Sequence, residues 1–248
     1  MMKIIAGWLS VLMLAAPTQA AEVMAAVAAN FTAPMKMLAK SFEQDTGHKL
    51  VLSFGSTGSF YAQIKNGAPF DVLLAADSDT PLRLEKDGLG VAGSRFTYAT
   101  GRLVLWSPKA GVVDDQGSVL RNGKFQRLAI ANPKLAPYGA AAMQVLANLG
   151  LEATVQPKLV QGENIAQAYQ FTASENAQIG FVALSQVFMQ GHISQGSAWV
   201  VPAHLHAPLQ QDAIVLRKGQ DNPGAQALRV YLQSEKARRT LQTFGYVK

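Results

Sequence analysis

Hydrophobic positions follow two different spacings along the chain, and the change from one to the other predicts strands that are followed by helices. A short apolar run at residues 23–28 leads into Asn30 and Pro34, and Gly47 closes the segment. Between Pro34 and Gly47, apolar side chains recur three and four positions apart, at Met35, Leu38, Ala39 and Phe42. Such spacing gives a helix one buried face, and Pro34 and Gly47 suit its first turn and its C-terminal cap. This segment therefore predicts a strand, a turn and a helix.

The same order recurs through two successive stretches of about 80 to 100 residues, each the size of a small domain. We expect further strands at 49–54, 71–76, 98–106, 127–131, 157–160 and 179–184, a loop at 132–138, and helices at 60–65, 139–148 and 164–172. Two helices close the chain, one opened by Asn222 and Pro223 and one by Ser234. Strands that alternate with amphipathic helices imply parallel pairing covered on both faces, and two such units favour two lobes over one large sheet.

The first 20 residues have the layout of a signal peptide. Lys3 precedes an apolar run at 4–16, and small residues stand at Ala20 and Ala21. The run is shorter than the ~18 residues of a membrane-spanning helix, and no later stretch has that character. We expect export with cleavage near Ala20, the alternatives being an uncleaved anchor or a buried N-terminal helix.

Composition narrows the class of protein. With 49% hydrophobic and 15% charged residues and no cysteine, the 248-residue chain fits neither a disordered protein nor a disulfide scaffold. Lys and Arg number 22 against 16 Asp and Glu, a formal charge of +6, but no run of four basic residues occurs. The excess charge therefore gives no sign of nucleic-acid binding.

Four turns that follow predicted strands and open predicted helices carry the candidate chemistry. They are Ala29-Asn30-Phe31-Thr32, Gly55-Ser56-Thr57-Gly58-Ser59, the segment from Asn132 to Gly139, and Gly162-Glu163-Asn164-Ile165. Ligands of open α/β sheets sit beyond the carboxyl ends of strands, and helix N-termini offer unpaired N–H groups to anions. Side-chain donors of Asn30, Ser56, Thr57 and Tyr138 would add to such a site. Each turn alone is more often a structural cap, except that capping explains Tyr138 poorly.

At this point the chain resembles a known family over residues 22–248. The segments that carry the resemblance are residues 28–35, 53–64, the string Asn66-Gly67-Ala68-Pro69-Phe70-Asp71-Val72, the string Gly93-Ser94-Arg95-Phe96-Thr97-Tyr98-Ala99, Ala136-Pro137-Tyr138-Gly139, and Gly180-Phe181-Val182-Ala183-Leu184. They are similar to those of the ModA-type periplasmic molybdate-binding proteins of ABC importers.

The resemblance implies a two-lobed, type II periplasmic-binding-protein fold, with a mixed, mainly parallel sheet in each lobe and the ligand in the cleft between them. One lobe would comprise residues 21–101 and 205–248, and the other residues 102–204. The family's ligand positions fall here on Asn30, Thr57, Tyr138 and the backbone N–H of Ile165, with Ala29 and Ser56 as neighbours. Some members supply a tyrosine where this chain has Ala183.

The resemblance further implies a periplasmic monomer that closes its lobes around molybdate or tungstate and partners a membrane permease. Molybdenum or tungsten would enter only as the bound oxyanion, with no cofactor and no enzymatic activity. None of the four proposed ligand positions is ionisable near neutral pH, which favours molybdate, tungstate or sulfate over partly protonated phosphate. We expect Glu163 and Lys134 to be solvated residues at the margin, because a carboxylate would repel a dianion.

Other constellations are weaker. His204 and His206 have a spacing that can bind a metal on a strand, but a surface loop before Pro208 is the better interpretation, since no third ligand type lies nearby. Asp71, Asp77 and Asp79 are expected to start a strand and cap a helix rather than act as acid and base. Two alternative functions remain: a binding protein of this fold for sulfate, thiosulfate or a small organic acid, and an exported hydrolase. The hydrolase lacks a Gly-x-Ser-x-Gly motif.

Overall fold

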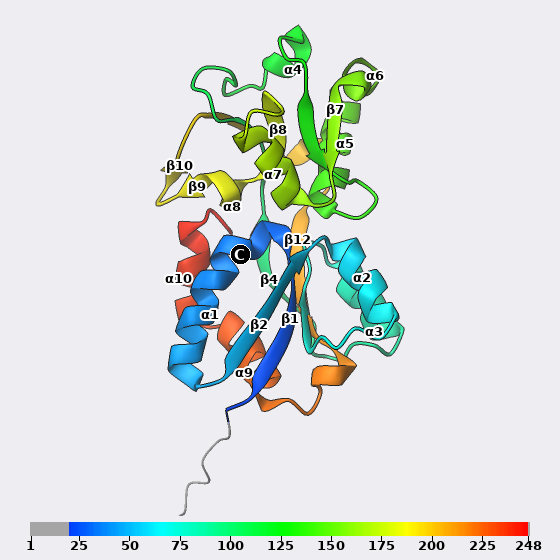
Figure 1. The fold of residues 1–248 in the computed structure, drawn as a ribbon, viewed down its shortest axis with the longest axis vertical. Coiled ribbons are helices and arrows are strands. Elements are labelled where there is room, and N and C mark those ends of the chain that lie inside the picture. Colours follow the sequence, from blue (N-terminus) through cyan, green and yellow to red (C-terminus); the bar gives the residue numbers. More distant parts are fainter. Residues whose placement is uncertain (1–19, 248) are drawn as a thin grey trace, which may run out of the picture.

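A computed structural model describes residues 20–247 and shows two lobes stacked along the long axis of the molecule (Figure 1). Each lobe is a five-stranded sheet flanked by helices, so the expected α/β fold class with two mixed sheets is confirmed. The expected signal peptide lies outside the described residues except for Ala20.

The first sheet has the strand order β2-β1-β3-β12-β4. Its strands are β1 (Glu22–Ala28), β2 (Lys49–Gly55), β3 (Val72–Leu74), β4 (Phe96–Gly101) and β12 (Leu209–Val215). β1 pairs in parallel with β2 and β3, whereas β12 runs antiparallel between β3 and β4. A strand from the last part of the chain therefore completes a sheet that the first part begins.

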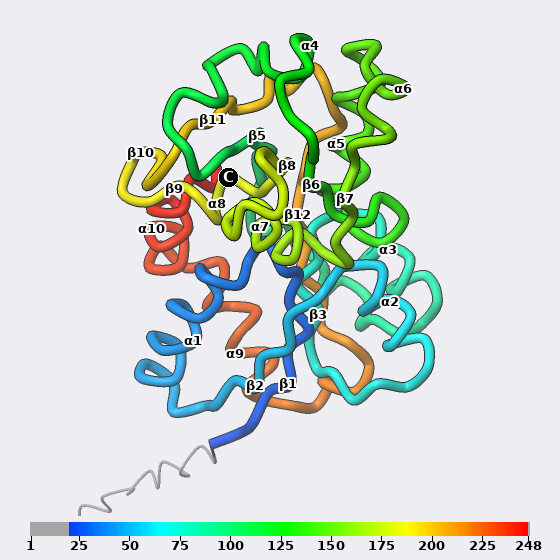
Figure 2. Tube along the Cα trace, turned by 45° about the horizontal axis from the view of Figure 1, so that its top comes forward, coloured from blue at the N-terminus to red at the C-terminus, as the bar shows by residue number. Residues whose placement is uncertain are grey.

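Helices cover both faces of this sheet. They are α1 (Thr32–Thr46), α2 (Thr57–Lys65), α3 (Asp79–Lys86), α9 (Pro223–Leu232) and α10 (Glu235–Thr243), with 3-10 turns at Ala29–Phe31 and Arg217–Gly219. One apolar core joins the sheet to α1, α9 and α10, and another joins it to α2 and α3. α10 returns to lie beside α1 (Figures 1 and 2).

The second sheet has the order β11-β5-β8-β6-β7. Its strands are β5 (Leu103–Ser107), β6 (Leu128–Ala131), β7 (Leu159–Gly162), β8 (Ile179–Ala183) and β11 (Ser197–Val200). β6 pairs in parallel with β7 and β8, and β5 pairs antiparallel with β8 and β11. In both sheets, parallel and antiparallel pairings among the described strands are equal in number, so the sheets are mixed without a parallel majority.

The second lobe holds α4 (Val119–Asn122), α5 (Pro137–Asn148), α6 (Glu152–Val155), α7 (Ile165–Ala173) and α8 (Leu184–Val187), with 3-10 turns at Gln156–Lys158 and Ala203–Leu205 and a small hairpin of β9 (Phe188–Met189) and β10 (His192–Ile193). Its main apolar core also takes in Ala28, Ala29 and Ala76 from the first lobe. The two lobes are thus in direct apolar contact.

The sequence pattern predicted several helix ends and faces that the structure confirms. The apolar face predicted for α1 is buried, and Gly47 caps the helix with a left-handed φ of 73°. Asn222 accepts hydrogen bonds from the first N–H groups of α9, and Ser234 does so for α10. Cap residues and 3.6-residue periodicity act locally, which is why they are legible in the sequence.

The single strand expected at 98–106 is wrong, because the chain leaves one sheet and enters the other at this point. β4 ends at Gly101 and β5 begins at Leu103, so Arg102 joins strands of different lobes. The chain crosses back between β11 and β12 (Figure 2). The pattern alternates before Arg102 and is apolar after it, and both patterns are typical of strands, so the sequence pattern alone does not divide the segment in two. The lobe boundaries proposed at 101/102 and 204/205 remain a prediction.

Three further boundaries differ from expectation. α2 begins at Thr57 rather than residue 60, and α5 begins at Pro137, which places Tyr138 in a helix rather than in a loop. Pro157 lies in a 3-10 turn, and β7 starts at Leu159 instead. A proline is favoured in a first helical turn, which accounts for the start of α5. Because of these earlier starts, the N-termini of α2 and α5 both lie at the boundary between the lobes.

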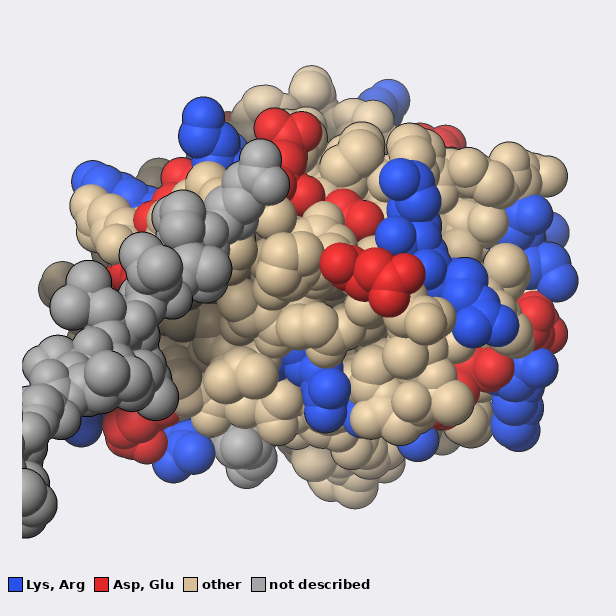
Figure 3. All heavy atoms as spheres, turned by 90° about the horizontal axis from the view of Figure 1, so that it is seen from below, with Lys and Arg blue, Asp and Glu red and all other residues tan. Residues whose placement is uncertain are grey.

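The surface mixes charges of both signs. On the face seen in Figure 3, Lys and Arg side chains alternate with Asp and Glu rather than forming one basic stripe. Within residues 20–247, no helix combines the length and hydropathy required to cross a bilayer.

Candidate functional site

A small cavity lies at the boundary between the lobes, beyond the carboxyl ends of β1 and β2. Its walls come from four helix starts, the ends of two strands and one residue after a third strand, namely Ala28, Ala29, Asn30, Gly55, Ser56, Thr57, Ala76, Ala136, Pro137, Tyr138, Asn164 and Ile165. All four predicted ligand positions and both predicted neighbours are in this set. The space between these walls is about 200 Å³ when the part open to solvent is counted, and only about 10 Å³ of it has room for the centre of a water-sized sphere. Its size favours a small ion.

Backbone donors converge on this cavity. Thr57 opens α2, Tyr138 lies in the first turn of α5, and Ile165 opens α7. In the described part of the chain, the N–H groups of these three residues find no protein acceptor. First-turn N–H groups cannot bond within their helix and carry partial positive charge. Three such groups facing one enclosed space form a site for an anion.

The hydroxyl of Thr57 adds a directed donor. The N–H of Ala76 donates to Thr57 Oγ1 over 2.9 Å, and Thr57 is 1% exposed. Because the oxygen already accepts, its proton is left for a ligand. Ser56 differs, since its hydroxyl is 2.6 Å from Ser59 Oγ and also accepts from the Ser59 N–H as the N-cap of α2.

The Asn30 side chain does not offer its amide donors to the cavity, contrary to the expectation from the sequence. Its Nδ2 donates to Gln211 Oε1 over 2.9 Å and to Tyr246 OH over 3.0 Å. Both amide hydrogens are therefore used inside the protein, so a hydrogen bond from Asn30 to a ligand would have to come from its backbone N–H. Its carbonyl oxygen accepts from Ser185 Oγ over 2.7 Å, which links it to the other lobe.

Tyr138 is the one ionisable residue on the cavity wall, and burial keeps it neutral. It is 1% exposed, and desolvation raises the pKa of its phenol well above the usual value. Gln211 Nε2 donates to its hydroxyl oxygen over 3.2 Å. A neutral phenol in such a site can donate a hydrogen bond without adding charge.

Charged side chains lie outside the cavity. Lys134 and Glu163 are exposed and are absent from its walls, as the sequence predicted. Lys134 instead lines a larger groove of about 1030 Å³ that shares Ala76, Ala136 and Pro137 with the cavity. That groove also carries Asp77, Asp79, Arg83 and Tyr61.

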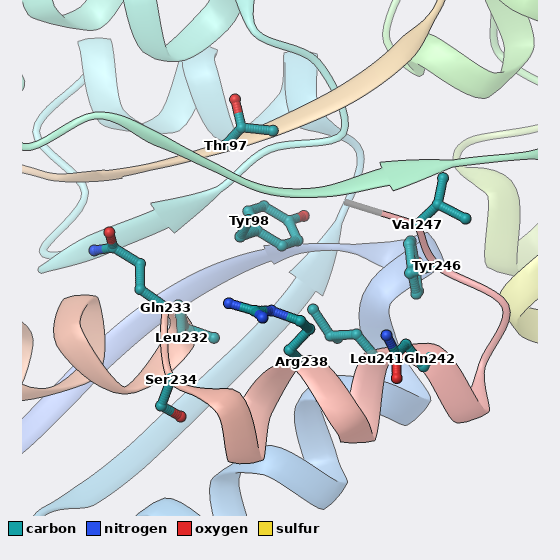
Figure 4. Close-up of a pocket in the computed structure, with 10 residues that line it drawn as sticks. All are labelled: Thr97, Tyr98, Leu232, Gln233, Ser234, Arg238, Leu241, Gln242, Tyr246 and Val247. Carbon is teal, nitrogen blue, oxygen red and sulfur yellow. The ribbon is translucent and has the colours of Figure 1, made fainter.

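A second pocket lies between α10 and β4 (Figure 4). Its guanidinium, from Arg238, pairs with Glu235 over 2.9 Å, and the remaining walls include Leu232, Leu241 and Val247. With its cation neutralised and apolar walls around it, this pocket is a poor match for a free oxyanion.

The other polar candidates have structural roles. Asp71 Oδ2 accepts from the Met24 N–H at the start of β3, and Asp77 Oδ1 accepts from the Thr80 N–H in the first turn of α3. His204 is exposed in a 3-10 turn, as expected of a surface loop, and residues 20–247 contain no group of three potential metal-ligating side chains. Ala183 is buried at the start of α8 and does not border the cavity.

The sequence pattern did not reveal the polar residues directly behind the cavity. Gln211, Tyr246 and Ser185 are buried and bond to Asn30 or Tyr138. Gln211 stands between the polar residues Gln210 and Asp212 in β12, and Tyr246 lies near the end of the chain, and no local pattern marks either as part of a site. Only Tyr98 belonged to a segment already noted, as one that carries the family resemblance.

Comparison with known proteins gives matches that span nearly the whole chain. A family described as bacterial extracellular solute-binding proteins matches residues 23–247. The molybdate-binding protein ModA of Azotobacter vinelandii is 62% identical over 94% of this chain and 93% of its own length, and ModA of Rhodobacter capsulatus is 47% identical over 94% and 91%. A solved periplasmic molybdate-binding protein of Azotobacter vinelandii has a TM-score of 0.89 at 41% identity, covering 91% of this chain and 99% of that chain.

Proposed function

Because the chain belongs to the ModA family of bacterial extracellular solute-binding proteins, we propose that it captures molybdate in the cavity between its lobes and delivers it to the permease of an ABC importer. In this proposal the protein is a periplasmic binding protein rather than an enzyme, and tungstate, which has the same charge and shape, binds in the same place.

The observation that carries this proposal is a cavity with neutral walls onto which three unpaired helix N–H groups converge. A tetrahedral dianion can be held by such dipoles alone, since each contributes partial positive charge at short range. We assign ligand contacts to Asn30, Thr57, Tyr138 and the Ile165 N–H, with Ala29 and Ser56 adjacent. Thr57 and Ile165 come from opposite lobes, so the ion stabilises the closed form, which a permease then recognises.

The site also supports discrimination by protonation state. The cavity walls offer N–H and O–H donors to a ligand, and they carry no carboxylate that could accept a proton from it. A partly protonated phosphate would bring a donor that finds no acceptor, whereas a fully ionised oxyanion would not. Discrimination against sulfate follows from size, because the smaller ion leaves donors too distant.

Calorimetric titration with molybdate, tungstate, sulfate and phosphate tests the proposal. Micromolar or tighter binding of both metal oxyanions, with a higher melting temperature and at least about a hundredfold weaker sulfate binding, is expected. Preferential binding of sulfate, or no response to any oxyanion, would contradict it.

A further inference from the structure

A buried hydrogen-bond network lies directly behind the cavity and joins the two lobes. Its members are all 6% exposed or less: Asn30, Tyr98, Tyr138, Ser185, Gln211 and Tyr246. Three bonds cross from lobe to lobe: from Ser185 Oγ to the Asn30 carbonyl, from Tyr246 OH to Ser185 Oγ, and from Gln211 Nε2 to Tyr138 OH. The network therefore connects residues that line the cavity to residues that do not touch it.

Gln211 is the member whose donor and acceptor ends are both committed. Its Oε1 accepts from Asn30 Nδ2 over 2.9 Å, and the Tyr98 hydroxyl, whose one proton is shared between this oxygen and the Ala75 carbonyl, lies 2.9 Å from each. Its Nε2 donates to the hydroxyl oxygen of Tyr138 over 3.2 Å. Since the Asn30 amide donates to the oxygen of the Gln211 amide, the Gln211 nitrogen faces Tyr138.

This arrangement determines where the Tyr138 proton goes. The Tyr138 oxygen accepts from Gln211, and among the described residues the Tyr246 hydroxyl, which already accepts from Asn30 Nδ2, is the neighbour that competes with a ligand for the Tyr138 proton. A buried donor without a partner is unfavourable unless a ligand supplies the acceptor. We propose that Gln211 is a positioning residue that presents the Tyr138 hydroxyl to the bound oxyanion as a donor. This inference rests on the proposed function.

The surroundings hold Gln211 in place. A side chain at position 101 would overlap both Tyr138 OH and Gln211 Nε2, so Gly101 leaves room for this pair. The neighbouring Asp212 is fully buried and accepts from Arg95 Nη1 over 2.6 Å and from Thr97 Oγ1 over 2.8 Å, at a β-bulge in β12.

These contacts give a physical role to the Gly-Ser-Arg-Phe-Thr-Tyr-Ala segment. Ser94 accepts from the Val215 N–H, Arg95 and Thr97 hold Asp212, and Tyr98 bonds to Gln211. Together these contacts hold the part of β12 that carries Gln211. Tyr98 and Tyr246, which belong to the network, also line the pocket beside α10 (Figure 4).

Exchanging the amide for a carboxylate reverses the direction of one bond. In Gln211→Glu, Asn30 and Tyr98 still donate, but the second carboxylate oxygen accepts the Tyr138 proton and withdraws it from the ligand. When the new carboxyl is protonated, it donates to Tyr138 as the amide does. The titratable groups that face position 211 are the phenols of Tyr98, Tyr138 and Tyr246, and burial raises the pKa of each, that of Tyr246 to about 12. Asp212, the adjacent carboxylate, is held by Arg95 and Thr97.

The test is molybdate calorimetry on wild type, Gln211→Glu, Gln211→Met and the control Gln210→Glu at about pH 8 and about pH 5.5, a range in which a buried carboxyl titrates. Gln210 is exposed, so the control places the same charge change one residue away. We expect Gln211→Glu to bind about a hundredfold more weakly at the higher pH and to recover at least tenfold at the lower, Gln211→Met to bind about tenfold more weakly at both, and the control to match wild type.

Tyr138→Phe completes a double-mutant cycle with Gln211→Met, which keeps the side-chain volume and needs no charge to be buried. The phenylalanine is expected to weaken binding about tenfold or more in wild type and less than threefold in the Gln211→Met background. Equal losses in both backgrounds, or a Gln211→Glu affinity that follows wild type at both pH values, would overturn the positioning role. Failure of wild type to bind molybdate would instead overturn the proposed function along with it.

Discussion

The cavity and the groove beside it share three wall residues but differ in charge and in size. The cavity, about 200 Å³, has no Lys, Arg, Asp, Glu or His on its walls. The groove, about 1030 Å³, carries Asp77, Asp79, Arg83 and Lys134. Neutral dipoles therefore surround the smaller of the two spaces, and the larger one carries the formal charges.

The two spaces therefore suit different tasks: the cavity suits discrimination between oxyanions, and the groove suits attraction of the ion. Inside a desolvated cavity, a cationic side chain would attract any anion strongly, and discrimination between oxyanions would depend on charge alone. N–H groups act only at hydrogen-bond distance, so the affinity that they provide depends on the size and protonation state of the ligand. Charges in the groove are hydrated and act over longer range, which suits encounter rather than recognition.

A carboxylate placed in the cavity has the largest expected effect. Thr57→Asp puts a negative charge where the ion would bind, and one unit charge pair at ~4 Å costs ~4 kcal/mol at an effective dielectric constant near 20. We expect molybdate affinity to fall at least about a thousandfold by calorimetry. Ser78→Asp, which adds the same charge in the groove, is the matched control and should lose less than about tenfold. Similar losses in both variants would mean that the two spaces do not differ as described.

A wedge between the lobes is expected to have the next largest effect. The Gly58 N–H donates to the Leu135 carbonyl across the boundary over 2.8 Å, and a Cβ at position 58 would stand 3.0 Å from the Leu135 backbone. Gly58→Ala should weaken molybdate binding about three- to tenfold by hindering closure. The melting temperature of the unliganded protein should not fall, because alanine favours the helix. A drop in melting temperature with unchanged affinity would show that closure does not involve this contact.

Removing a cation from the groove should change only the rate of encounter. Lys134 is exposed, and the described residues place no carboxylate within ion-pair distance of it. We expect Lys134→Gln to lower the association rate about two- to threefold at low salt in stopped-flow experiments, with the dissociation rate unchanged. Lys124→Gln, an equal charge change on the far side of its lobe, serves as the comparison. An altered dissociation rate would place Lys134 in the site itself.

The smallest expected effect is on the stability of the folded protein and comes from a carboxyl group in the groove. Burial raises the pKa of the Asp77 carboxyl above its ordinary 3.8. Protonation is therefore favoured by folding, and the stability that it contributes is present below pH 3.8 and lost as the pH rises through the folded-state value. Asp77→Asn mimics the protonated form and should raise the melting temperature by ~1–2 °C at neutral pH but not in acid. Asp79→Asn, at an exposed neighbour, should give no such pH-dependent gain.

Local signals explain which parts of the fold the sequence predicted. The buried face of α1, its cap at Gly47 and the caps Asn222 and Ser234 depend on residues within one or two turns. The family resemblance implied a lobe boundary at 101/102, but the strand pattern of 98–106 did not show a break at Arg102, because that pattern is the same whether one sheet or two receive it. Hydropathy records burial, and it does not record against which sheet a strand is buried.

The candidate site divides in the same way. Turns after strands pointed to Asn30, Thr57, Tyr138 and Ile165, and the structure brings these four to one cavity. The orientation of the Asn30 amide could not be predicted, because its partners Gln211 and Tyr246 lie 181 and 216 residues away along the chain. Which donor a side chain presents depends on long-range packing that a single sequence leaves open.

The place of β12 in the first sheet has a consequence for the order of assembly. β12 lies between β3 and β4, so those two strands cannot join until residues 209–215 arrive. During synthesis the whole second lobe emerges first, and the amino-terminal half waits with unsatisfied strand edges. Such delayed closure makes folding slow and non-local, and it keeps the nascent chain open until nearly all of it has been made.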